Sequence, residues 1–77
     1  MLFLIDYDRR RGQIVRMFTY DDSRRREAED ARLALDLELR QSGVEREIVL
    51  LEAASEEALR KTHSRYFDNW ITIARSA

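Results

Sequence analysis

The chain contains no cysteine and no proline, and its 77 residues include one histidine and two glycines. Without cysteine there can be no disulfide and no thiolate metal site, and one imidazole is too few for a zinc site built from protein ligands alone. Small domains without disulfides or a structural metal are often stabilised by a partner subunit instead. The composition therefore predicts no resident metal or cofactor, and it favours self-association.

Long apolar runs are missing as well. The first apolar run, residues 1–5, ends at Asp6, far short of the roughly 20 residues that span a bilayer. It also lacks the basic leader and the small-residue cleavage site of a signal peptide. We therefore expect a cytoplasmic protein that does not bind a membrane.

Neither sign of charge is in large surplus, because 14 basic residues face 15 acidic ones and the net charge is −1. This balance argues against simple wrapping of nucleic acid, which usually needs a basic surplus. The basic residues are nearly all arginine, which suits bidentate contact with phosphate or carboxylate. A coding bias explains the same enrichment more simply.

The N-terminal segment is typical of a β-hairpin. Residues 2–7 are apolar on both faces of a strand, which indicates a central position in a sheet. A turn over residues 8–12 contains Gly12, which can adopt the positive φ of a hairpin loop. Residues 13–20 then read as a second strand, with Val15, Met17 and Thr19 on one face. The opposite face of that strand would carry Ile14, Arg16, Phe18 and Tyr20.

A long helix is predicted from about Ser23 to Gln41, with Gly43 as its left-handed cap. Residues 44–51 read as a third strand that is also apolar on both faces. Ser55, followed by Glu56 and Glu57, marks the start of a second helix. That helix would carry Leu59, Thr62, His63, Tyr66 and Phe67 on its apolar side.

We therefore predict a single α+β domain over residues 1–77, with the order β-β-α-β-α. The three strands would form a mainly antiparallel sheet in the spatial order second, first, third, and both helices would cover one face. Residues 68–77 would form either a short strand or a docked tail.

The long helix carries leucines on two sides. Its core stripe contains Ala28, Leu35 and Leu39, whereas Leu33 and Leu37 project to nearly the opposite side. Together with the apolar tail, these outer leucines form the candidate interface: Leu33, Leu37, Trp70, Ile71 and Ile73. Either the tail packs on the outer side of its own helix, or the five residues form a subunit interface in which Trp70 is an anchor. We favour a non-enzymatic protein-interaction module that forms a homodimer or binds another protein.

Two arginine triplets suggest an alternative function. Arg9, Arg10 and Arg11 lie in the predicted hairpin loop, and Arg24, Arg25 and Arg26 lie in the first turns of the long helix. Arginines near helix N-terminal amides suit phosphate, so the alternative is a module that binds nucleic acid or another anion. Neighbouring carboxylates and the net negative charge make a salt-bridged surface the favoured interpretation.

No residue set indicates catalysis. His63 could act as a general base oriented by Asp68 or Glu56, but Ser64 points about 100° away from it on a helix. Asp6 and Asp8 have the spacing of a metal pair, yet Asp6 is expected near a strand end in contact with solvent. We therefore predict no catalytic, cofactor-binding or metal-binding residue, and an enzyme is not the favoured interpretation.

Overall fold

The computed structural model describes residues 1–67, so the predicted tail over 68–77 lies outside the described residues. The central element is strand β1, Leu2–Asp8, and hairpin loop residues 9–12 connect it to β2, Gln13–Tyr20. A short 3-10 turn, Asp22–Arg24, precedes helix α1, Arg25–Gln41. Strand β3, Glu47–Glu52, and helix α2, Glu56–Thr62, follow. The predicted order β-β-α-β-α is confirmed.

The sheet has the order β2-β1-β3, and β1 is antiparallel to both neighbours, as the sequence predicted. Ile5 pairs with Met17 on one side and with Val49 on the other. All five residues from Leu2 to Asp6 are at most 1% exposed. The apolar character of both faces of this strand therefore follows from its position between two strands and two covering layers.

A β-bulge changes the facing of β2 near the hairpin loop. Asp6 pairs with Arg16 but Tyr7 pairs with Ile14, so Val15 is the extra residue on β2. Ile14 consequently packs against the same core as Met17, and Val15 is 48% exposed. The prediction that Ile14 faces away from Met17 was wrong, because strict alternation assumes a strand without a bulge.

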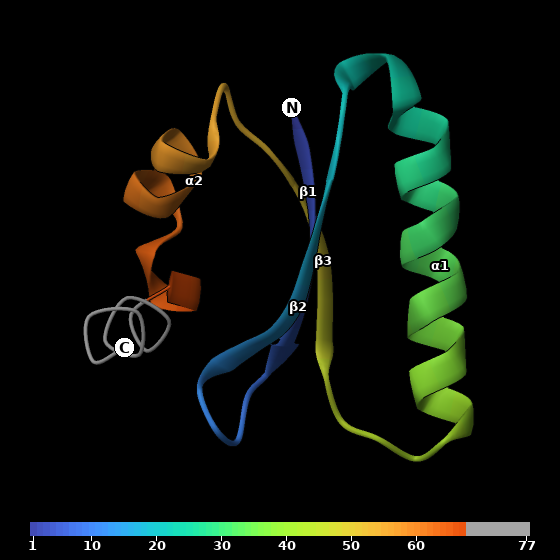
Figure 1. Ribbon diagram of the computed structural model, residues 1–77. Helices are drawn as coiled ribbons and strands as arrows, with labels where there is room; N and C mark the ends of the chain where they lie inside the picture. The colour runs from blue at the N-terminus through green and yellow to red at the C-terminus, as the bar shows by residue number, and fades with distance from the viewer. Residues whose placement is uncertain (68–77) are drawn as a thin grey trace.

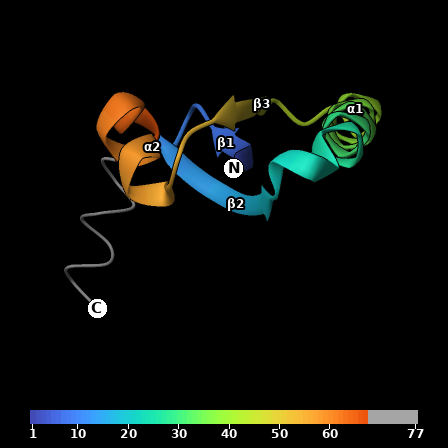
Figure 2. The same ribbon diagram turned by 90° about the horizontal axis from the view of Figure 1, so that it is seen from above.

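The helices lie on opposite faces of the sheet (Figure 2). One face carries Phe3 and Ile5, which form a core cluster with Leu59 of α2 and with Tyr66 and Phe67 after it. Residues Leu2 and Leu4 point to the other face, where α1 contacts β1 and β3. The prediction of both helices on one face was wrong in this respect. A central strand that is apolar on both faces needs a cover on each, and α2 supplies the second one.

The helix boundaries follow the predicted signals closely. Helix α1 ends at Gln41, and Gly43 has a φ of 72°, as expected for a left-handed cap. At α2, the side-chain oxygen of Ser55 accepts a hydrogen bond of 3.1 Å from the amide of Ala58. Helix α2 stops earlier than its apolar pattern suggests, because His63 leaves helical geometry with φ −126° and ψ 47°. The chain then resumes helical geometry and buries Tyr66 and Phe67.

Candidate functional site

The outer side of α1 carries the first part of the predicted interface. Leu33 and Leu37 are 57% and 58% exposed, although they belong to a helix whose other side is buried through Ala28, Leu35 and Leu39. Within the described range 1–67, each of the two residues keeps more than half of its surface exposed. The structure therefore presents them as a surface pair, as the helical projection predicted.

The remaining predicted interface residues, Trp70, Ile71 and Ile73, lie outside the described residues. The described chain ends at Phe67, which is fully buried in the core cluster on the α2 face. Helix α1, which carries Leu33 and Leu37, lies on the other face of the sheet (Figure 2).

Strand β2 offers a second apolar surface, which the sequence analysis did not assign. It is an edge strand that pairs with β1 alone in the described sheet. Phe18 shares the α1 face with Leu4, its partner on β1, yet it is 43% exposed because α1 lies over β1 and β3. Val15, displaced by the bulge, is also exposed. The predicted strand order already made β2 an edge, but the offset of α1 could not be read from a pattern.

The two arginine triplets lie at opposite ends of the sheet (Figure 1). Residues 9–11 are in the hairpin loop, next to the pair Asp8 and Gln13, whereas residues 24–26 follow the end of β2, where Tyr20 pairs with Leu2. Two arginines of the second triplet have close carboxylate partners. Arg24 donates to Glu27 at 2.5 Å, and Arg25 donates to Glu52 at 2.6 Å. The triplets therefore do not form one continuous cationic surface.

Asp6 is the one buried charged residue in residues 1–67, with 1% of its surface exposed. Its Oδ2 accepts hydrogen bonds of 3.0 Å from Nε of Arg16 and from one guanidinium nitrogen of Arg46. The prediction that Asp6 meets solvent was wrong, because β3 extends the sheet past it and pairs Ile48 opposite it. A buried charge needs such partners, so the carboxylate and its two arginines form one unit.

The suggested metal pair of Asp6 and Asp8 is not supported. The carboxylate of Asp8 accepts hydrogen bonds from the amides of Arg10 and Arg11, at 3.0 and 3.2 Å, and so closes the hairpin loop. Among residues 1–67, no group of three histidine, aspartate or glutamate side chains is placed to hold a metal ion.

Glu47 links the start of β3 to the residues after α2. Its carboxylate accepts hydrogen bonds from the hydroxyl of Tyr66, from Arg65 at 2.7 Å and from Arg9 at 2.9 Å. Partial burial opposes the charge, but these hydrogen bonds outweigh it and hold the pKa of Glu47 below its usual value. Burial, together with the hydrogen bond to Glu47, raises the pKa of Tyr66. The rings of Tyr7 and Tyr66 also pack perpendicular to each other, with centroids 4.9 Å apart. This cluster fastens the α2 layer to the sheet.

His63 lies at the end of α2 and is half-buried. Within the described range, its Nδ1 lies 2.9 Å from the hydroxyl of Thr62, which itself lies 3.0 Å from the carbonyl of Ala58. The imidazole therefore contributes to the hydrogen bonding of a helix end, and Asp68, one of its suggested partners, lies outside the described residues.

Comparison of the chain with protein-family models, with curated proteins and with solved structures returned no match. Neither described helix combines the length and the apolar composition that crossing a membrane requires. The functional argument therefore depends on the surfaces described above.

Proposed function

We propose that the protein is a self-associating, non-enzymatic interaction module, in its simplest form a homodimer. Its interface comprises Leu33 and Leu37 on the outer side of α1, together with Trp70, Ile71 and Ile73. The observation that carries the proposal is the exposure of the two leucines, 57% and 58%, on a helix that already buries its opposite side. The absence of cysteine supports a cytoplasmic location as part of the same proposal.

The placement of the described elements supports contact between copies. Phe67 is buried on the α2 face of the sheet, whereas α1, which carries Leu33 and Leu37, lies on the opposite face (Figure 2). In the proposed two-fold dimer, residues that follow Phe67 in one copy contact the outer leucines of the other copy, and both copies are satisfied at once.

The outer leucines can contribute substantially to such an interface. Complete burial of an exposed leucine side chain contributes about 1.5–3 kcal/mol. Because Leu33 and Leu37 are a little over half exposed, each has about 1 kcal/mol still to gain. A two-fold dimer buries four of these side chains, which gives about 4 kcal/mol, or about a thousandfold in the dissociation constant.

The test is a pair of matched double variants, studied by sedimentation equilibrium. Leu33→Gln with Leu37→Gln should shift the protein to monomer while leaving its circular dichroism spectrum unchanged. Val15→Gln with Phe18→Gln removes apolar area of similar exposure, 48% and 43%, from the β2 edge and should leave the dimer intact. If only the β2 variant dissociates, the interface lies on the edge strand and our assignment is wrong.

A further inference from the structure

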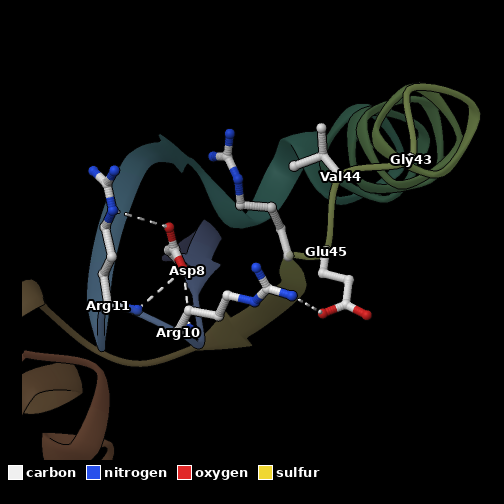
Figure 3. Close-up of a pocket in the computed structure, with 7 residues that line it drawn as sticks. Asp8, Arg10, Arg11, Gly43, Val44 and Glu45 are labelled. Carbon is white, nitrogen blue, oxygen red and sulfur yellow. Dashed lines mark hydrogen bonds and ion pairs between the residues drawn. The ribbon is translucent and has the colours of Figure 1, made fainter.

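The hairpin end of the molecule contains a surface that goes beyond self-association. Two adjoining hollows, of about 520 and 350 Å³, lie between the hairpin loop and the loop that joins α1 to β3. They share Arg10, Val44, Glu45 and Arg46. Figure 3 shows the lining of the larger one. Their volumes fall within the usual range of small-molecule sites.

Arginines from three segments line these hollows. They are Arg9, Arg10 and Arg11 of the hairpin loop, Arg40 at the end of α1, and Arg46 just before β3. The lining carboxylates are Asp8, Asp36 and Glu45. Each of these arginines has a carboxylate within 4 Å, but the contacts differ in strength: those of Arg10 with Glu45 and of Arg11 with Asp8 are 3.9 Å long, whereas Arg9, Arg40 and Arg46 lie 2.9–3.2 Å from Glu47, Asp36 and Asp6. Of these five arginines, only those of the hairpin loop are adjacent in sequence, and the fold brings Arg40 and Arg46 to them.

Arg46 is positioned for an anionic ligand by the buried Asp6. One guanidinium nitrogen donates to Asp6 at 3.0 Å, and the side chain of Arg46 is only 22% exposed. A guanidinium has five N–H donors in a planar fork, so donors remain for a ligand in the hollow. Partial burial lowers the local dielectric, which strengthens their attraction to a negative charge.

Arg10, unlike Arg46, is exposed to solvent and can change its contacts to bind a ligand. Its contact with Glu45 is 3.9 Å long, and the two side chains are 85% and 84% exposed. Such an ion pair contributes little and is readily exchanged for a stronger partner. Figure 3 shows Arg10 and Arg11 extending from the hairpin loop, with Val44 and Glu45 on the α1–β3 side.

We propose that this hollow binds the phosphate group of a small phosphorylated molecule, with Arg10, Arg11 and Arg46 as its ligands. A phosphate monoester carries a charge of about −2 at neutral pH and three acceptor oxygens, so it is a stronger partner for Arg10 and Arg11 than the carboxylates 3.9 Å away from them. Leu39 and Val44 supply apolar contact for the rest of the molecule. A long polyanion fits less well, because the two arginine triplets lie at opposite ends of the sheet and form no continuous cationic surface (Figure 1).

The experiment is a titration of the 77-residue chain with phenyl phosphate, followed by ¹⁵N–¹H NMR. Saturable shifts are expected at the amides of residues 8–12 and 43–46, with phenyl phosphate and with inorganic phosphate. Sodium chloride at matched ionic strength should not reproduce them. Arg10→Gln, a change at an exposed side chain that preserves the fold, should weaken binding about tenfold or more. The matched control Arg25→Gln, at the other end of the sheet, should leave the affinity unchanged.

Arg46→Lys provides a second variant that retains a cation beside Asp6 but loses the planar fork, and it should also weaken binding. The proposal is overturned if no saturable shift occurs at these amides. Equal losses in Arg10→Gln and Arg25→Gln would also overturn it, as would tighter binding of an RNA oligonucleotide that depends on arginines at both ends. Because each variant keeps the outer leucines of α1, failure here is distinguishable from failure of the dimer.

Discussion

Replacing Asp6 with asparagine should destabilise the fold by about 3 kcal/mol, because this side chain is buried and holds two arginines. Each hydrogen bond to a charged group is worth about 1.5–3 kcal/mol. Asparagine keeps one acceptor oxygen, and the side chains of Arg16 and Arg46, 44% and 22% exposed, regain some hydration. The two hydrogen bonds together are worth about 3–6 kcal/mol, and this partial compensation puts the loss at the lower end of that range. The Oδ1 atom of Asp6 has no hydrogen-bond partner in the described structure, so an amide nitrogen there gains no acceptor.

The assay is urea unfolding followed by circular dichroism, at one fixed protein concentration because self-association adds to apparent stability. A loss of about 3 kcal/mol is a large fraction of the roughly 4–12 kcal/mol expected for a domain of this length. Glu57→Gln is the matched control, because its ion pair with Lys61 spans 3.5 Å between side chains that are 81% and 75% exposed. The control should change stability by less than about 0.5 kcal/mol. If Asp6→Asn costs less than about 1 kcal/mol, the buried carboxylate does not fix the arginines as we argue.

Three further predictions concern other layers of the structure. Leu59→Ala, at a fully buried position under α2, should cost about 2–5 kcal/mol in urea unfolding, and a cost below about 1 kcal/mol would mean that α2 is not part of the core. Ser55→Ala removes the hydrogen bond to the amide of Ala58 and should cost about 1 kcal/mol in thermal unfolding, whereas Ser55→Asp should preserve stability. The pKa of Glu47 is lowered in the folded state, so its contribution to stability is present above its ordinary value of 4.5 and is lost as pH falls through the folded pKa. Between about pH 5 and pH 3, the urea midpoint of Glu47→Gln should therefore fall by less than that of the parent protein. Parallel plots of urea midpoint against pH for the two proteins would contradict the lowered pKa of Glu47.

Much of the fold could be predicted because local signals agreed with one another. The two-faced apolar run of β1 required a central strand, and Ser55 and Gly43 marked helix ends that the structure confirms. The face of the sheet that α2 covers was harder to predict, because no periodic pattern within α2 indicates it. The apolar run of β1 did indicate it indirectly: a strand that is buried on both faces requires a covering layer on each side of the sheet.

The site was less predictable than the fold, because its parts come from distant positions. Asp6 is joined by Arg46, which lies 40 residues away in the chain, and no spacing rule connects them. The bulge at Val15 also interrupts the alternation of side chains between the two faces of β2, which the rest of the strand follows. Leu33 and Leu37 were predictable as an exposed pair, since helical projection needs no tertiary information. The contribution of Trp70, Ile71 and Ile73 to an interface stays a prediction.

The most direct test of self-association is the solution mass of the unmodified protein, measured by light scattering over a dilution series. We expect a mass near twice the chain mass of 9.2 kDa, falling toward the monomer only at high dilution. The double variant Leu33→Gln with Leu37→Gln should give the monomer mass over the whole series while retaining its helix and strand content. A mass of 9.2 kDa for the unmodified protein at every concentration would contradict the proposed function.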